Sequence, residues 1–202
     1  MDLERAYAET CRQQSDINEQ LPLLHQYALS CQHITEFGVR LGVSTTCFLH
    51  ARPRVLVSYD VEKKPDTISH LCGLADAAGV EFSFRKIDVR TTRIEPTELL
   101  FIDTWHVYEQ LRVELLVHAE MVSRFIALHD TVTFGDVGES PGHGGLWQAI
   151  IEFLYREPEW TVVEHRSNNN GLTILGRRRQ WNTKLALENQ AKELDPLCSQ
   201  KP

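Results

Sequence analysis

The sequence contains few cysteines, and none of them form the C-x-x-C pair of a zinc or redox motif. Their number is odd and they are scattered over the whole chain, which does not suit a framework of disulfides. Scattered single thiols are instead typical of a protein from a reducing compartment. The five cysteines are Cys11, Cys31, Cys47, Cys72 and Cys198.

The chain also lacks long apolar and long basic runs. No apolar stretch approaches the ~18 residues of a membrane span, and the first residues show no signal-peptide pattern. A formal net charge of -7, from 21 basic and 28 acidic residues, argues against nucleic acid or an anionic membrane as the main partner. The short basic run at 177–179 is better explained as the solvated end of a strand. We therefore expect a cytoplasmic protein that binds neither nucleic acid nor membrane.

What the sequence does contain is an alternation of short apolar segments and helical periods from about residue 32 onwards. The apolar segments are continuous, as expected for strands covered on both faces. Alternation at this short spacing predicts an α/β protein with a doubly wound, mostly parallel sheet. Strands are expected over 33–39, 54–59, 81–87, 98–102 and 124–128, and helices over 44–51, 66–78, 108–122 and 146–155.

After the fifth strand the pattern changes. Two apolar runs, 160–165 and 172–176, flank the turn residues 168–171, which predicts an antiparallel hairpin and a sheet of seven strands. With about 200 residues, the chain is long enough for one good core.

We expect three parts along the chain. Two helices within 1–31 precede a main domain over 32–180, and a polar helix and tail follow over 181–202. Apolar residues of the first part, such as Leu21 and Leu24, can pack on the sheet or on a second subunit, so a homodimer is one candidate assembly.

Acidic residues gather where the predicted parallel strands end. Asp60, Asp88, Asp103 and Asp130 lie at or just beyond four strand ends, and Glu36 lies where the first strand passes into a loop. Open α/β sheets bind ligands in the crevice outside these ends. A rim of acids disfavours phosphate and suits ribose hydroxyls, an adenine amino group, a sulfonium or a metal ion.

The loop EFGVRLGVS at 36–44 is the most informative segment. Gly38 and Gly42 allow the backbone to approach a ligand, and a helix beginning near Ser44 points unpaired N–H groups toward the same space. Arg40 stands where the dinucleotide motif G-x-G-x-x-G needs its second glycine. This pattern favours S-adenosylmethionine over a dinucleotide as the cofactor.

With its acid-x-Gly-x-x-x-Gly loop and the ordered strand-end acids, the sequence over about 32–177 resembles the class I S-adenosylmethionine-dependent methyltransferases. The segments DTWH at 103–106 and HDT at 129–131 resemble small-molecule O-methyltransferases of the catechol and sugar or macrolide types. The resemblance implies that Gly38 and Gly42 border the methionine part, that Asp60 binds the ribose hydroxyls, and that Asp88 lies near the adenine amino group. We therefore expect the cofactor-binding residues to be Glu36, Gly38, Gly42, Ser44, Asp60 and Asp88.

Methyl transfer to a hydroxyl requires that the hydroxyl lose its proton, and a divalent cation lowers its pKa. Asp103 and Asp130 close adjacent predicted strands and can converge on one Mg²⁺, with His129 as a candidate third ligand. His106 lies three residues after Asp103, the offset at which the resembling enzymes carry a base. Asp103 and His106 are therefore the expected catalytic residues, acting on a small hydroxylated metabolite.

Each of these assignments has a plainer alternative. Asp103 can simply cap a helix, His106 can begin one, and His129 can bond to a neighbouring carboxylate. The whole chain can be a non-catalytic or metal-independent relative that binds the cofactor, and a dinucleotide-dependent oxidoreductase is a more distant alternative. A catechol, a sugar and a natural-product hydroxyl all remain open as acceptors.

The glycine-rich segment 131–147 is long for a connection inside one domain. Such loops are usually functional or disordered. Because it follows the strand that ends at Asp130, we expect it to border the acceptor pocket, with Asp136 and His143 as candidate contacts.

Overall fold

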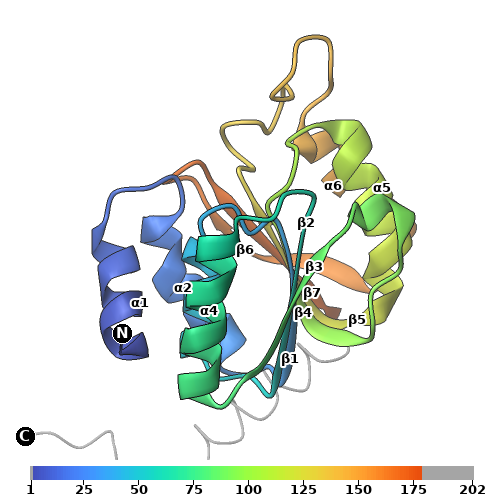
Figure 1. Cartoon of the computed structure of the whole chain (residues 1–202). Coiled ribbons are helices and arrows are strands. Elements are labelled where there is room, and N and C mark those ends of the chain that lie inside the picture. Colours follow the sequence, from blue (N-terminus) through green and yellow to red (C-terminus); the bar gives the residue numbers. More distant parts are fainter. Residues whose placement is uncertain (1, 179–202) are drawn as a thin grey trace, which may run out of the picture.

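Five apolar segments form a parallel sheet at the centre of the protein (Figure 1). The structure is a computed structural model of the chain and describes residues 2–178. Ile34 and Phe37 lie on opposite faces of the first strand and are both fully buried, which explains why the strands read as continuous apolar runs. The parallel strands are β1 (His33–Phe37), β2 (Val55–Asp60), β3 (Glu81–Lys86), β4 (Thr97–Ile102) and β5 (Val122–His129).

The last two strands complete the sheet as an antiparallel hairpin. They are β6 (Trp160–Arg166) and β7 (Leu172–Arg177), and β7 pairs with β5. The strand order is β3-β2-β1-β4-β5-β7-β6, so the direction of winding reverses between β1 and β4. The predicted seven-stranded, mostly parallel, doubly wound sheet is therefore confirmed.

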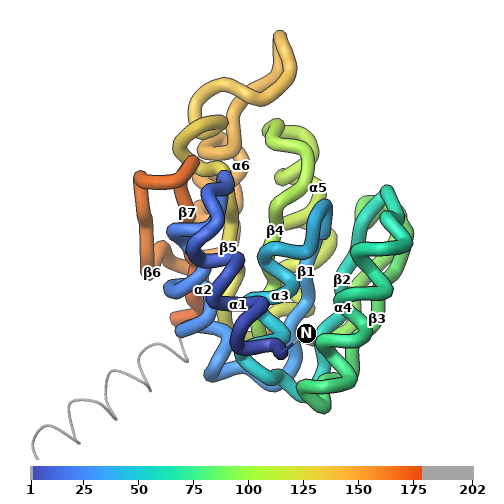
Figure 2. Tube along the Cα trace, turned by 60° about the vertical axis from the view of Figure 1, so that its left-hand side comes forward, coloured from blue at the N-terminus to red at the C-terminus, as the bar shows by residue number. Residues whose placement is uncertain are grey.

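Helices cover both faces of the sheet (Figure 2). One face carries α3 (Val43–His50) and α4 (Pro65–Ala78), and α1 (Leu3–Arg12) and α2 (Leu21–Ala28) pack against α3. The other face carries α5 (Tyr108–His118) and α6 (Leu146–Arg156). Two apolar cores lie between these layers and the sheet. Within residues 2–178, no helix has the length and apolar character needed to cross a membrane.

Three short 3₁₀ turns complete the elements: η1 (Asn18–Gln20), η2 (Val89–Thr91) and η3 (Ala119–Met121). The helix expected over 108–122 is shorter than the sequence pattern suggests, because η3 replaces its last turn and Val122 already pairs with Thr97 in the sheet. The helix and tail expected over 181–202 lie outside the described residues.

Candidate active site

The ends of β1, β4 and β5 lie side by side and bring the predicted site residues to one edge of the sheet. Phe37 is paired with Ile102, and Ile102 is paired with Leu128. The residues that follow these three, Gly38, Asp103 and His129, therefore stand at one level of the sheet. Asp103 N–H also donates to the carbonyl of Phe37 (2.9 Å), which ties the end of β4 to β1.

The loop after β1 turns sharply at Gly38, and its backbone is held by an acid from β2. Gly38 has a φ of +87°, and a Cβ built there would lie 1.9 Å from the backbone oxygen of Asp103. Oδ2 of Asp60 accepts hydrogen bonds from Val39 N (2.9 Å) and Arg40 N (3.0 Å). The resting position of Asp60 thus shapes the loop from which α3 begins.

Glu36 lies beneath this loop with its carboxyl group fully buried. It accepts hydrogen bonds from Ser44 Oγ (2.6 Å), Thr45 Oγ1 (2.8 Å) and Ser58 Oγ (2.6 Å). Burial raises the pKa of Glu36 to about 7, although the three hydroxyls favour the ionised form. The structure brings Glu36 and Ser44 together as a support for the glycine loop, and a contact of either with a cofactor stays a prediction.

Asp88 lies two residues beyond β3, and its carboxylate forms an ion pair with Arg90. The guanidinium donates to both carboxylate oxygens, with Nη2 at 2.7 Å from Oδ2 and Nε at 3.0 Å from Oδ1. The same arginine lowers the pKa of Asp88. Asp60 and Asp88, the residues expected to bind ribose and adenine, therefore both have protein partners in this structure, and their cofactor contacts stay predictions.

A cavity of about 180 Å³ opens beside Asp60. It lies between the glycine loop, the end of β2, the start of α4 and Phe84 of β3. Its walls combine the carboxylate of Asp60 with the apolar side chains of Val39 and Ile68, so it offers polar and apolar contacts to one ligand.

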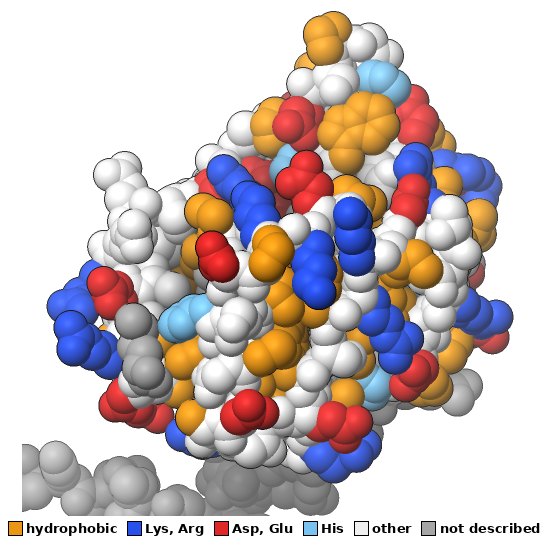
Figure 3. Space-filling view, viewed as in Figure 1, with side chains coloured by type: hydrophobic (Ala, Val, Ile, Leu, Met, Phe, Trp, Pro, Cys, Tyr) orange, Lys and Arg blue, Asp and Glu red, His pale blue; other side chains and the backbone are white. Residues whose placement is uncertain are grey.

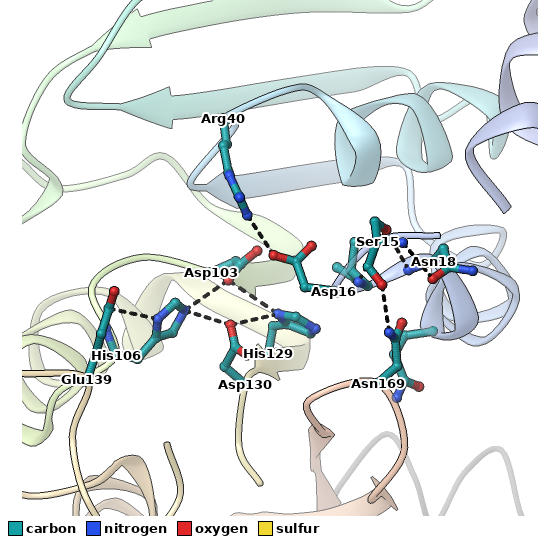
Figure 4. A network of polar contacts seen from close by, with 12 residues as sticks. Ser15, Asp16, Asn18, Arg40, Asp103, His106, His129, Asp130, Glu139 and Asn169 are labelled. Atoms are coloured by element: carbon teal, nitrogen blue, oxygen red, sulfur yellow. Dashed lines mark hydrogen bonds and ion pairs between the residues drawn. The ribbon is translucent and has the colours of Figure 1, made fainter. Parts of the chain in front are cut away.

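Two carboxylates and two imidazoles form a closed cluster at the ends of β4 and β5 (Figure 4). Nε2 of His106 lies 3.1 Å from Asp103 Oδ1 and 2.9 Å from Asp130 Oδ2. Nδ1 of His129 lies 3.4 Å from Asp103 Oδ1 and 3.1 Å from Asp130 Oδ2. The structure thus brings together all four residues that the sequence analysis assigned to catalysis or metal binding.

The charges of this cluster balance one another. Burial alone would lower the pKa of His106 and of His129, but hydrogen bonds to Asp103 and Asp130 outweigh it and raise both pKa values to about 10. The imidazolium groups in turn hold the pKa of Asp103 and of Asp130 below the usual aspartate value against their burial. These contacts therefore favour ionised carboxylates together with protonated imidazoles.

Asp103, His129 and Asp130 also lie close enough together that they could hold one metal ion. One ligand atom from each of the three lies within 4.8 Å of the others. Oδ1 of Asp130 is buried without a hydrogen-bond partner, and Asp130 has a left-handed φ of +59°. Strained backbone and unpartnered buried atoms are concentrated at functional sites. Two carboxylates beside an imidazole are a donor set that suits a divalent cation.

The loop over 131–145 covers one side of the cluster and supplies a residue that the sequence analysis missed. Oε2 of Glu139 lies 3.1 Å from Nδ1 of His106, and the ring of Phe134 stacks on the same imidazole with centroids 5.0 Å apart. Nothing in the sequence pattern linked Glu139 to His106, which lies 33 residues earlier. The only signal was the unusual length of this loop.

Other residues of the loop fasten it to the segment after β4. Ser140 Oγ accepts from Trp105 Nε1 (3.2 Å), and Nδ1 of His143 lies 3.1 Å from Oε2 of Glu109. Figure 3 shows hydrophobic side chains at the surface of this projecting part of the molecule. Trp105 is 43% exposed and Val137 is 69% exposed. Asp136 instead borders an open groove beside α6.

The segment between α1 and α2 bridges the glycine loop and the β6–β7 turn (Figure 4). Asp16 pairs with the guanidinium of Arg40 (2.6 Å), so this arginine of the glycine loop has an acidic partner. At the other end, Asn169 donates through Nδ2 to the carbonyl of Ser15 (2.8 Å) and accepts from Glu19 N through Oδ1 (2.9 Å). The sequence analysis recognised residue 169 only as part of a turn.

A second buried acid, Glu114 of α5, lies behind the cluster. Its Oε1 accepts from Thr104 Oγ1 (2.8 Å) and Gln110 Nε2 (2.6 Å), while Oε2 has no partner. Burial raises the pKa of Glu114 to about 7, from a usual value of 4.5.

We expect Glu114 to make the protein less stable as pH rises. Because the folded-state pKa is the higher one, its contribution to stability is full below pH 4.5 and is lost as pH rises through about 7. The wild type should therefore lose about 3 kcal/mol relative to Glu114→Gln over this range. Urea unfolding of both proteins across the range measures it, and a difference that does not change with pH would contradict it.

Solved structures with the same fold are O-methyltransferases and related methyltransferases. The O-methyltransferase from Bacillus cereus in complex with SAH superposes with a TM-score of 0.61 at 16% identity, covering 87% of this chain and 90% of that chain. TomG from Streptomyces achromogenes, an O-methyltransferase of tomaymycin synthesis in complex with SAM, gives 0.57 at 19% identity, covering 85% and 89%. The SAH-bound methyltransferase PaMTH1 from Podospora anserina gives 0.53 at 17% identity, covering 87% of each chain.

No protein-family model and no curated protein matches the chain. The structural matches and the strand order together define the class: the chain has the fold of class I S-adenosylmethionine-dependent O-methyltransferases. At these levels of identity the likeness concerns the fold, and the chemistry has to be argued from the residues of this chain.

Proposed function

We propose that the protein transfers a methyl group from S-adenosylmethionine to a hydroxyl of a small molecule. The observation that carries the proposal is the cluster of Asp103, His106, His129 and Asp130 directly beside the turn at Gly38. Two observations support the proposal together. The chain shares its fold with SAM- and SAH-bound methyltransferases, and its acid–base groups lie at the edge where open α/β sheets bind ligands.

In this proposal His106 accepts the proton of the acceptor hydroxyl at Nε2. A cation held by Asp103, His129 and Asp130 would supply charge that orients the hydroxyl and lowers its pKa. The negative charge of Asp103 and Asp130 raises the pKa of His106 and so keeps it protonated. A bound cation would offset that negative charge, and the imidazole would then lose its proton more easily. Mg²⁺ is the cation we propose, since the set is dominated by carboxylate oxygens.

The cofactor is proposed to lie over Gly38 and Gly42, with its ribose at Asp60 and its adenine toward Asp88. The cavity beside Asp60, which Val39 and Arg40 of the glycine loop also line, supports this placement. Glu36 and Ser44 support the loop from within, and their role is proposed to be in shaping the cofactor site.

One observation favours a metal-independent variant of the same reaction. The two imidazoles of the cluster already contact its two carboxylates, so protein groups alone can compensate part of their negative charge. In this variant a carboxylate of the cluster, Asp103 or Asp130, orients the acceptor hydroxyl and takes its proton as the new O–CH3 bond forms and the bond from sulfur to the methyl group breaks.

Calorimetric titration with SAH, in Mg²⁺ and then in EDTA, tests the cofactor and metal together. Binding that is strengthened by Mg²⁺ supports the metal-assisted reaction, and equal binding in EDTA supports the metal-independent one. Catechols and monosaccharides are then screened for methyl uptake from radiolabelled SAM. No SAH binding under either condition would overturn the proposed function.

Asp60→Ala is expected to weaken SAH binding by ~1–3 kcal/mol, because the carboxylate is proposed to bind the ribose hydroxyls and also holds the backbone of the glycine loop. Isothermal titration measures the change. Asp76→Ala, which removes an exposed acid of α4 that does not line the cavity, is the control and should bind SAH as the wild type does. Equal affinity of Asp60→Ala and the wild type would remove Asp60 from the site.

A further inference from the structure

The imidazole of His106 is held at both ring nitrogens by different parts of the chain. Nε2 faces Asp103 and Asp130 at the strand ends, and Nδ1 faces Oε2 of Glu139 at 3.1 Å. The imidazole also stacks on the ring of Phe134, and the two ring planes are 11° apart. Only one orientation of the ring satisfies all of these contacts.

Glu139 and His106 are also joined through their backbones. Glu139 N–H donates to the carbonyl of His106 (2.9 Å), and His106 N–H approaches Oε2 of Glu139 (3.4 Å). These contacts place the carboxylate on the Nδ1 side of the ring. The His106 side chain is 17% exposed and that of Glu139 is 46% exposed, so the pair lies at the mouth of the cluster.

We propose that Glu139 is the positioning residue of His106. The carboxylate accepts a hydrogen bond from Nδ1–H, so that Nε2 is the nitrogen turned toward the strand-end carboxylates and toward an acceptor hydroxyl. Partners on the far nitrogen of a functional histidine commonly fix its tautomer and its ring orientation. This assignment rests on the proposed role of His106 as the base, and it adds a residue from the loop over 131–145 to that role.

A second pair, between His143 of the same loop and Glu109 of α5, serves as a matched control. It allows the effect of Glu139 on His106 to be separated from the attachment of the loop. Glu109 holds Nδ1 of His143 at 3.1 Å, the same distance at which Glu139 holds His106, and it also fastens the loop to the segment after β4. Glu109 does not touch His106 in these contacts. Glu109→Ala therefore loosens the loop without removing the partner of the base.

The first experiment records the Nδ1–H resonance of His106 in protein labelled with ¹⁵N-histidine, at one fixed pH. We expect a hydrogen-bonded Nδ1–H signal in the wild type, in Glu139→Gln and in Glu109→Ala, and its loss in Glu139→Ala. The glutamine variant retains an acceptor oxygen and serves as the conservative rescue. A signal unchanged in Glu139→Ala, or lost equally in Glu109→Ala, would overturn the proposal.

The second experiment compares kcat and KM of the variants with the best acceptor of the methyl-uptake screen, at saturating SAM. Glu139→Ala should lower kcat about 10–100-fold with little change in the KM for SAM, while Glu139→Gln recovers much of the loss. A wild-type kcat in Glu139→Ala would overturn the positioning role. A wild type that neither binds SAH nor transfers methyl would instead overturn the proposed function, and the resonance would still report on the Glu139–His106 bond.

Discussion

Replacing His106 with alanine is expected to lower the rate of methyl transfer by ~10²–10⁴-fold while SAH affinity is retained. The imidazole is the one side chain that contacts Asp103, Asp130 and Glu139 at once, so its loss removes the proposed proton acceptor. The measurement is a single-turnover assay with the acceptor found in the screen, accompanied by calorimetry with SAH.

The same substitution is also expected to change the stability of the protein. Removing the His106 imidazolium leaves Asp130, whose side chain is 5% exposed, with His129 as its remaining cationic partner. His106→Ala should therefore become less stable, and Mg²⁺ should restore part of the stability if the carboxylates bind a cation. His165→Ala, which removes an imidazole from the β6–β7 hairpin, is the control for rate and stability. A wild-type rate in His106→Ala would exclude it as the base.

The fold could be predicted because its signals are local and repeat along the chain. Ile34 and Phe37 show why: strands buried on both faces are continuous apolar runs. An acid at the end of β2, and one directly after each of β4 and β5, marks where these strands stop. The hairpin could be read from the tract of asparagines before Gly171, which three apolar strand residues follow. The end of α5 could not, because the start of β5 is set by pairing with Thr97 rather than by helix propensity.

The candidate site could be predicted only in part. The pattern of strand ends indicates which residues meet at one edge of the sheet, but it does not indicate which partners each side chain contacts. Asp103 and Asp130 could be placed together from the strand ends alone. By contrast, whether Glu36 faces a ligand or three hydroxyls depends on the side chains above and below β1, which a strand buried on both faces does not reveal. The contact of Glu139 with His106 depends on the path of a long loop, for which the sequence has no period.

The protonation state of the four cluster residues could not be predicted from the sequence either. A histidine after an acid suggests a base near its usual pKa, but two carboxylates around His106 raise that pKa to about 10. For His106 to act as the base, a cation or another positively charged group must therefore first compensate the negative charge of Asp103 and Asp130. The comparison of SAH binding and methyl transfer in Mg²⁺ and in EDTA bears directly on this requirement.

Gly38→Ala is expected to have the largest effect on stability among single substitutions in the glycine loop. A Cβ at this position would lie 1.9 Å from the backbone oxygen of Asp103, and the φ of +87° is already unfavourable for alanine. Because the obstacle is backbone at the end of β4, the strand ends must separate to relieve it. We expect a loss of at least about 3 kcal/mol, seen as a lowering of Tm by roughly 6–12 °C.

Gly42→Ala is the matched control, since it shares the positive φ (+77°) but meets only the end of the Leu71 side chain, at 3.0 Å. A flexible side chain can move aside, so the cost should be about 1–2 kcal/mol from backbone strain. Differential scanning calorimetry of the two variants separates strain from collision. If Gly42→Ala proved as unstable as Gly38→Ala, the close approach of Gly38 to Asp103 would not be what constrains this turn. Because Asp103 contacts both imidazoles of the cluster, the Nδ1–H resonance of His106 should be impaired in Gly38→Ala and preserved in Gly42→Ala.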